Sequence, residues 1–138
     1  MELVREFMRT YQQLVPKIPI LPDPVTQNLR YRLIDEEAQE LAEATNPKEY
    51  LDAVGDLLYV VYGAALAAGF SPHQVDAAFT EIHRSNMSKV WTDDEIDSIP
   101  ADCRSTRVGD NRHIVRRSDG KIAKSPSYSP ARLESYTR

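Results

Sequence analysis

Two consecutive helix-forming segments, residues 25–44 and 47–69, carry acidic side chains on sides that are otherwise apolar. At 100° per residue, Glu36 and Glu40 fall on the same side of the first segment as Leu33. The pattern therefore predicts that these two carboxylates face inward. Few soluble folds accept such a pattern, because a carboxylate that leaves water needs a cation beside it.

The second segment repeats the feature. Asp52 and Asp56 share a stripe with Tyr59, so the two acid-bearing faces are expected to meet. Between Leu33 and His83 the sequence holds ten acidic residues and one basic residue, Lys48. An unpaired buried carboxylate costs several kcal/mol, so the counter-charge is expected to be a metal ion. Oxygen ligands without a nearby Cys or His suit a hard ion, Mg²⁺ or Mn²⁺.

Composition sets the class of protein. At 138 residues with a formal net charge of −4, the chain is expected to be one soluble, cytoplasmic domain with no membrane segment. The single Cys103 excludes an internal disulfide. Residues 101–138 reverse the charge, with nine Lys or Arg against four Asp or Glu, which indicates contact with phosphate or an acidic subunit, or else a solvated tail.

Periodicity predicts an all-α, four-helix-bundle-like fold. Helices are expected at residues 2–15, 25–44, 47–69 and 72–91. The proline-rich residues 16–24 should form an extended linker whose apolar side chains lie across a groove. The predicted N-caps are Thr26 for the second helix, Asn46 or Thr45 for the third, Ser71 for the fourth and Thr92 for a short helix at 92–100.

The chain is divided into a helical domain, residues 1–100, and a basic C-terminal extension, residues 101–138, expected to pack on that domain or on a neighbouring subunit. The extension lacks a helical period. Two short runs around Asp119-Gly120 predict a hairpin within this irregular tail. The small residues of segment 47–69 permit close approach of another helix, either within the chain or in a homodimer or homotetramer.

Several motifs together resemble one family. They are EExxE at 36–40, Asp56-Leu57-Leu58-Tyr59, HRSNMSKV at 83–90 and DGKIAKSPSY at 119–128. This combination is similar to the MazG-like all-α nucleoside triphosphate pyrophosphohydrolases, in the phosphoribosyl-ATP pyrophosphohydrolase-like branch of phages and bacteria, over about residues 25–130. The resemblance implies Mg²⁺-dependent hydrolysis of a nucleoside triphosphate to a monophosphate and pyrophosphate.

The resemblance also implies roles for the carboxylates. Glu37, Glu40 and Asp56 map to metal ligands, and Glu36 maps to a ligand or a water-orienting base, so Glu36 and Glu37 are the expected catalytic pair. The family's second helix commonly carries ExxD, but its Glu position is Ala53 here. Asp52, four residues before Asp56, is the preferred replacement ligand, and Glu49 is the alternative.

The remaining motifs are basic. In the family, Asn86 and Lys89 are expected to contact the nucleotide, with Arg84 as a further partner, although such residues also occur as ordinary helix-end polarity. Lys121 and Lys124 are expected to close over the triphosphate of the same or a neighbouring subunit.

Three other functions are alternatives to this activity. The first is hydrolysis of phosphoribosyl-ATP, which is disfavoured because the RSNMSK segment and the long tail are similar to the broader branch, which acts on other nucleotides. The second is a helical adaptor or regulator whose acidic patch binds a basic partner. DNA binding, the third, is disfavoured because the basic residues lie in a tail without a helix-turn-helix pattern and the body is acidic.

Overall fold

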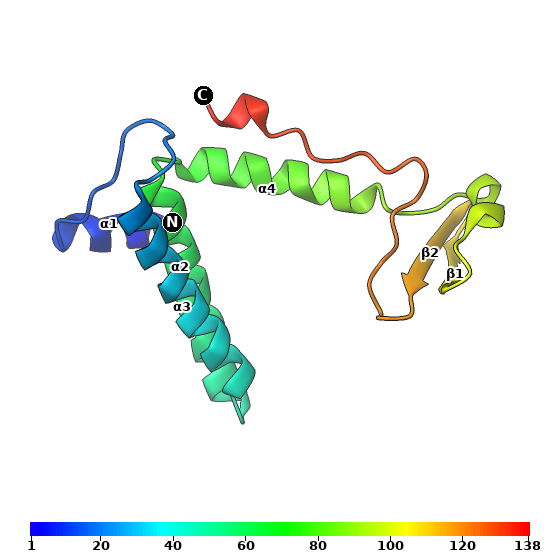
Figure 1. Ribbon diagram of the computed structural model, residues 1–138, viewed down its shortest axis with the longest axis horizontal. Coiled ribbons are helices and arrows are strands. Elements are labelled where there is room, and N and C mark those ends of the chain that lie inside the picture. Colours follow the sequence, from blue (N-terminus) through cyan, green and yellow to red (C-terminus); the bar gives the residue numbers. More distant parts are fainter. The chain divides into compact units, whose positions relative to one another are not determined.

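The structure, a computed structural model, describes all 138 residues. It is mostly helical with one small hairpin near the C-terminus, as predicted, but a four-helix bundle is not confirmed. The elements are α1 (Glu2–Thr10), α2 (Pro24–Glu43), α3 (Pro47–Ala67), α4 (Pro72–Met87), the 3₁₀ helix η1 (Asp93–Ser98), β1 (Cys103–Gly109), β2 (Arg112–Arg117) and the 3₁₀ helix η2 (Glu134–Tyr136) (Figure 1).

Contacts divide the chain into two compact units. The first unit holds residues Met1–Asp76 and Tyr136–Arg138, and the second holds Ala77–Ser135. Helix α4 begins in one unit and ends in the other. These units are defined by contacts alone, so the functional boundary expected after residue 100 stays a prediction.

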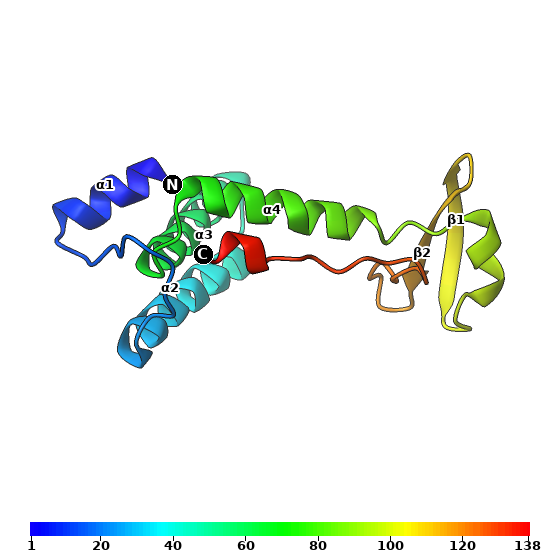
Figure 2. The ribbon, with the colours of Figure 1, turned by 90° about the horizontal axis from the view of Figure 1, so that it is seen from above.

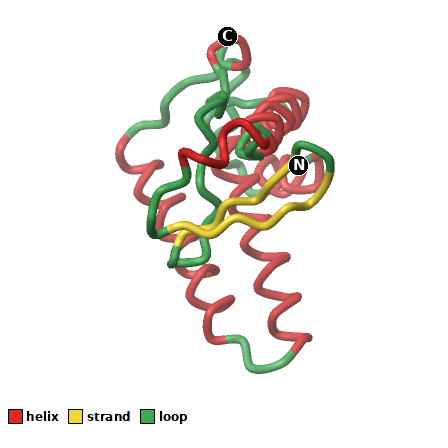
Figure 3. Tube along the Cα trace, turned by 90° about the vertical axis from the view of Figure 1, so that its right-hand side faces the viewer, coloured by secondary structure: helices red, strands yellow, loops and turns green.

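In the first unit, α2 and α3 form an antiparallel helical hairpin, and the two helices lie side by side along their length (Figures 1 and 3). Asn46 caps α3 as predicted, with its Oδ1 accepting hydrogen bonds from the backbone N–H groups of Lys48 and Glu49 at 3.1 and 3.0 Å. The predicted N-cap of α2 is wrong. Asp23 caps that helix and Pro24 occupies its first turn, where the missing N–H is not needed.

Helix α1 packs on the C-terminal part of α3. Their shared core consists of Val4, Met8, Leu66 and Ala67, and Met8 and Leu66 are fully buried. The predicted extent of α1 to residue 15 is wrong, because the chain turns at Gln12, which adopts a φ of 55°. Residues 13–15, which were predicted to be helical, belong to the linker that leads to α2.

The linker after α1 passes against the C-terminal end of α3. The backbone N–H of Ile20 donates to the carbonyl of Ala68 at 2.9 Å. At Gly69, φ is +78° and a β-carbon would stand 2.1 Å from the carbonyl oxygen of Ile18, so only glycine fits there. Gly69, the last residue of the predicted helix, follows the C-cap residue Ala68, and α3 itself ends at Ala67.

The linker's apolar side chains were predicted to lie across a groove. Ile18, Ile20 and Leu21 are all exposed, and Ile20 and Leu21 line a shallow hollow together with Ala68 and Phe70.

Helix α3 is long and apolar enough to cross a membrane by length and composition alone, and the core helix of a water-soluble protein meets the same criterion. It also carries the acidic residues Glu49, Asp52 and Asp56.

The second unit has its own small core, formed by Trp91, Val115 and Ala123. Helix α4 ends at Met87 and not near Trp91 as predicted, because the Trp91 backbone pairs with His113 of β2 in both directions, at 3.0 and 2.8 Å. The short helix η1 begins with the predicted cap, Thr92, which forms a reciprocal capping box with Glu95.

Strands β1 and β2 form an antiparallel hairpin that turns at Asp110-Asn111, beside η1 (Figure 2). The sequence placed the hairpin around Asp119-Gly120. That segment is a second turn, after which Ile122 pairs with Arg116 and Ala123 N–H donates to the Val115 carbonyl at 2.8 Å. The strand β2 is therefore flanked by β1 on one edge and by residues 122–123 on the other.

Candidate active site

The seam between α2 and α3 determines which acidic side chains leave water. Along α2 the half-buried positions recur at helical spacing and include Leu33, Glu37 and Leu41. On α3, Ala53 is buried at 3% exposure, and Leu57 is half-buried. Glu37 is therefore the one carboxylate of the EExxE motif that lies in the seam.

The inward orientation predicted for Glu36 and Glu40 is wrong, since both are exposed. Leu29, which shares the side of Glu36 and Glu40, is itself 44% exposed, so the leucine at this position does not mark the buried side of α2. A shift of one residue turns the helix by 100°, so the inward position passes to Glu37. Asp52 and Asp56 are also exposed, on the rim of the seam.

The carboxylates nevertheless form one cluster. Partial burial raises the pKa of Glu37, and the negative charges of Glu40, Asp56, Glu36 and Asp52 raise it further, in that order. These five side chains come from both helices, and the other four interact electrostatically with Glu37. The cluster contains every group predicted to hold metal or to orient water except the alternative ligand Glu49.

In the side-chain arrangement of the structure, no three of the acidic or histidine side chains converge closely enough to hold a metal ion. The donor set itself suits one. It consists only of carboxylates, which are the preferred ligands of Mg²⁺ and Mn²⁺, and four of its five members are exposed side chains that are free to turn toward a common point. Chemically, the cluster fits a hard divalent cation.

The two alternatives for the missing family glutamate differ in their surroundings. The carboxylate of Glu49 accepts hydrogen bonds from both the backbone N–H and the hydroxyl of Thr45, each at 2.9 Å, and these bonds lower its pKa. Glu49 thus closes the turn before α3. Asp52 makes no such bond, and its negative charge raises the pKa of Glu37. Ala53, the position of the family glutamate, is buried in the seam.

The predicted phosphate-binding residues belong to the second unit. Arg84 forms a bidentate ion pair with Glu81, in which both N–O distances are 2.8 Å. The same guanidinium donates to the Pro130 carbonyl at 3.0 Å and to the Ser129 hydroxyl at 3.2 Å. Arg84 therefore holds the tail in place.

Further residues of α4 and the segment after it complete this docking. Ser85 bonds the hydroxyl of Tyr128 at 3.1 Å, and the Ser88 hydroxyl accepts from the backbone N–H of Ser129 at 2.9 Å. Sequence reasoning missed this role. The signal that could have revealed it is the spacing of Glu81, Ser85 and Ser88, which places three polar side chains on one helix face.

The other predicted contacts are not used for docking. Lys89 Nζ donates to Asn86 Oδ1 at 2.7 Å, so these two residues form a pair. Lys124 Nζ lies 4.5 Å from the centre of the Tyr128 ring, a cation–π contact, and Lys121 is exposed. Lys89, Lys121 and Lys124 have no carboxylate partner in the structure.

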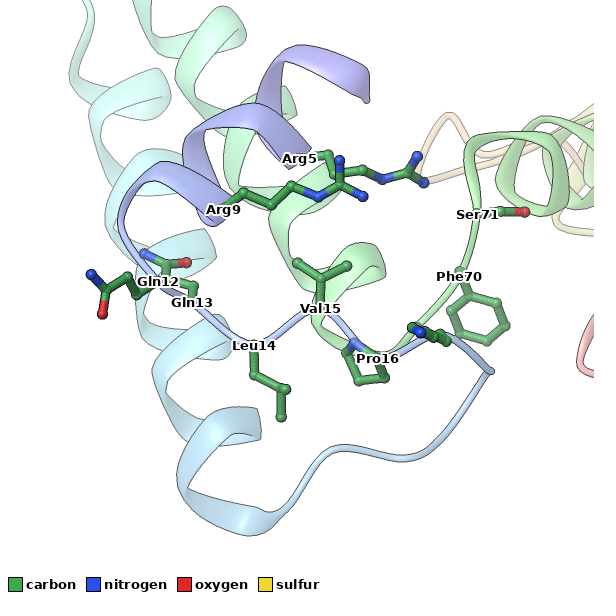
Figure 4. A pocket seen from close by; sticks show the side chains of 11 residues that line it. Arg5, Arg9, Gln12, Gln13, Leu14, Val15, Pro16, Phe70 and Ser71 are labelled. Carbon is green, nitrogen blue, oxygen red and sulfur yellow. The ribbon is translucent and has the colours of Figure 1, made fainter.

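The first unit also contains an open basic hollow of about 660 Å³ near the end of α1. Arg5 and Arg9, one helical turn apart, extend over the segment Val15–Pro16 and toward Ser71 (Figure 4). Arg5 is paired with Glu2 at 3.1 Å. Sequence reasoning assigned no role to these residues.

Comparison with known proteins decides the family. The phosphoribosyl-ATP pyrophosphohydrolase profile matches residues 4–86, which include the whole α2–α3 hairpin and all five clustered carboxylates. The chain belongs to this family. The phosphoribosyl-ATP pyrophosphohydrolase family consists of hydrolases that act on phosphoanhydride bonds. The predicted family is confirmed, although the match ends at residue 86 and does not include the motif at 119–128.

One relative is an uncharacterized protein of Acanthamoeba polyphaga mimivirus, 50% identical over 52 residues. The aligned segment is 36% of this chain and 21% of the viral protein, so the chain spans about a fifth of that relative's length. Most of the second unit, from residue 87 onward, lies outside the family match.

Proposed function

We propose that this member of the phosphoribosyl-ATP pyrophosphohydrolase family hydrolyses a nucleoside triphosphate between its α- and β-phosphates, in the presence of Mg²⁺. The observation that supports this most is the cluster around Glu37. Partial burial raises the pKa of Glu37, and the charges of four further carboxylates from the two packed helices raise it further. The cluster lies wholly within the family match.

In this proposal Glu37, Glu40, Asp52 and Asp56 hold the divalent ions, with Mn²⁺ as an alternative to Mg²⁺. The ions supply neutralisation of the phosphate oxygens and a lower pKa for a bound water. Glu36, exposed at the edge of the cluster, orients the attacking water or accepts its proton. The water oxygen bonds to the α-phosphorus as the bond between that phosphorus and the oxygen bridging to the β-phosphate breaks. The products are a nucleoside monophosphate and pyrophosphate.

Asn86, Lys89, Lys121 and Lys124 are the proposed contacts to the nucleotide. The lysines are not bound to carboxylates, which leaves their charges for phosphate oxygens. Arg84 acts through the tail, because its donors are engaged with Glu81, Ser129 and Pro130.

A homodimer or homotetramer, located in the cytoplasm, is the proposed working form. Large apolar side chains are exposed on every long helix, including Phe7, Leu58 and Phe79 at 40%, 51% and 71%. A monomer in water rarely exposes so many of these residues. Light scattering that gave the mass of one chain at working concentration would contradict this assembly.

Measurement of pyrophosphate release from a panel of nucleotides tests the activity. The panel contains the common ribo- and deoxyribonucleoside triphosphates and phosphoribosyl-ATP, each with Mg²⁺ and with EDTA. Metal-dependent release from a nucleoside triphosphate is expected, and preference for phosphoribosyl-ATP would overturn the substrate class. No release with any nucleotide, and no Mg²⁺-dependent rise in melting temperature, would favour the adaptor function.

A further inference from the structure

The second unit contains a hollow of about 700 Å³ at the open end of its hairpin, where β1 begins and β2 ends. The hollow lies outside the residues that match the family and outside the docking contacts of the tail. Its lining is basic. The residues are Ala101, Asp102, Cys103, Arg104, Thr106, Arg116, Arg117, Ser118 and Gly120.

Two of these arginines are direct cross-strand neighbours. Arg104 of β1 is paired with Arg116 of β2 in the hairpin register, so both side chains leave the same face of the strands. The β-carbons of such a pair stand about 4.5–5.5 Å apart. Both side chains are exposed, and neither guanidinium has a hydrogen bond or ion pair with any group of the protein.

Like charges directly opposite each other destabilise an antiparallel pair. Two other arginines of the hairpin have carboxylate partners: Arg107 pairs with Asp93 at 3.3 Å, and Arg117 lies 3.8 Å from Asp119. Arg104 and Arg116 therefore stand out as the repelling pair whose charge no group of the chain offsets.

The rest of the lining adds donors. Thr106 follows Arg104 by two residues on β1, so its hydroxyl is on the same face. Arg117 is also a lining residue, and its guanidinium is paired with Asp119. Asp102 is the one carboxylate in the lining, and its Oδ1 accepts a hydrogen bond from the thiol of Cys103 at 3.7 Å. The unpaired guanidinium groups of Arg104 and Arg116, against the one carboxylate of the lining, leave a surplus of positive charge.

We propose that this hollow binds an oligophosphate, either free pyrophosphate or the phosphate chain of a nucleotide, between Arg104 and Arg116. A guanidinium group binds a phosphate through two parallel N–H donors, and two neighbouring guanidinium groups match two linked phosphates. The ligand removes the repulsion that the hairpin carries when empty. This site is separate from the carboxylate cluster and does not rest on the proposed hydrolase activity.

Titration calorimetry with inorganic pyrophosphate tests the site, in low salt with EDTA, so that no metal ion recruits the ligand to the carboxylate cluster. Arg104→Gln and Arg116→Gln are each expected to weaken binding by about tenfold or more, since each removes one charge-assisted phosphate contact. Arg112→Gln is the matched control. It removes the same charge from an exposed position of the same hairpin, outside the hollow, and is expected to weaken binding less than about twofold.

Thermal melting without pyrophosphate shows that the variants are folded. Arg104→Gln and Arg116→Gln are expected to melt at or above the wild-type temperature, because each relieves the cross-strand repulsion. Pyrophosphate is expected to raise the melting temperature of the wild type but not that of either variant. A nonhydrolysable nucleoside triphosphate and orthophosphate are titrated in parallel. Tighter binding of the nucleotide than of pyrophosphate identifies a nucleotide as the source of the phosphates, and equal binding identifies free oligophosphate.

Three results would overturn the proposal. The first is no pyrophosphate binding by the wild type. The second is an equal loss in Arg112→Gln, which would mean diffuse attraction by the whole hairpin. The third is displacement of pyrophosphate by a single-stranded oligonucleotide whose binding affinity falls as much in Arg112→Gln as in Arg104→Gln. This result would identify an extended nucleic-acid surface instead.

Discussion

The Nη1 atom of Arg30 lies 3.1 Å from the point where a β-carbon on Gly63 would stand. The guanidinium of this α2 residue therefore rests against the backbone of α3. Its Nη2 donates to Gln13 Oε1 at 3.0 Å, whereas its buried Nε has no partner. Burial lowers the pKa of Arg30. The small residue in α3 makes room for a half-buried cation from the same chain.

Gly55 and Gly63 lie in the same helix and form a matched pair of test sites. A β-carbon on Gly55 would meet nothing within 4 Å, so Gly55→Ala should raise the free energy of unfolding by about 0.5–1 kcal/mol through helix propensity. Gly63→Ala gains the same propensity but pushes the Arg30 guanidinium away from Gln13. We expect no net gain, or a loss, in urea unfolding of Gly63→Ala.

The double variant Gly63→Ala/Arg30→Met separates the two effects. Without the guanidinium, alanine at 63 should recover the stabilisation seen at Gly55. If Gly55→Ala and Gly63→Ala raised the free energy of unfolding equally, the Arg30 guanidinium would move aside freely, and its contact with Gly63 would not affect stability.

The docking of the tail on α4 should depend on pH through Glu81. The hydrogen bond from Arg84, followed by the backbone N–H of Arg132, lowers the pKa of Glu81 from 4.5 to about 2. Because the folded pKa is the lower one, this carboxylate stabilises the docked tail fully above about pH 4.5, and the contribution is lost as the pH falls toward 2. The amide signal of Arg132, whose N–H donates to Glu81 at 2.9 Å, should titrate with that pKa in NMR spectra.

Substitution at neutral pH gives an independent test of the same contact. Glu81→Gln removes the charge that binds Arg84, so trypsin should cleave after Arg132 several times faster than in the wild type. Asp97→Asn is the control, since it removes an exposed carboxylate from the same unit without touching the tail. Equal cleavage of all three proteins would mean that the tail is held by other contacts.

Local features of the fold could be predicted from the sequence. Asn46, Ser71 and Thr92 cap helices where expected, because a cap is a bond between residues two or three apart. Gly69 adopts positive φ directly after the C-cap of α3, a position where glycine is common, although the carbonyl of Ile18 also excludes a side chain there. The existence of the four long helices followed from their periodicity alone.

Features that depend on distant contacts could not be predicted. The buried side of α2 is chosen by its packing on α3, so Glu37 took the inward place assigned to Glu36 and Glu40. The hairpin turn moved to Asp110-Asn111, because β2 pairs with residues on both of its edges. Arg84 docks a segment more than forty residues away, which no local pattern signals.

Tertiary context also bears on the departure from the family pattern at Ala53. Glu49, the alternative ligand, is bonded to Thr45 at the turn before α3, whereas the charge of Asp52 acts on Glu37. Asp52 is therefore the better substitute for the missing glutamate, and the proposed hydrolase activity should distinguish the two residues.

Asp52→Asn should keep the fold and lower pyrophosphate release by about 10² to 10³, the scale for removal of one preorganised stabilising group. Glu49→Gln should retain activity close to that of the wild type and lose a little thermal stability, because its amide keeps only part of the bonding to Thr45. Rates are compared at saturating Mg²⁺ with a nucleotide that the wild type hydrolyses, and circular dichroism monitors helix content. A dead Glu49→Gln beside a fully active Asp52→Asn would transfer the ligand role to Glu49. Two fully active variants would leave Asp56 as the sole contribution of α3 to the metal site.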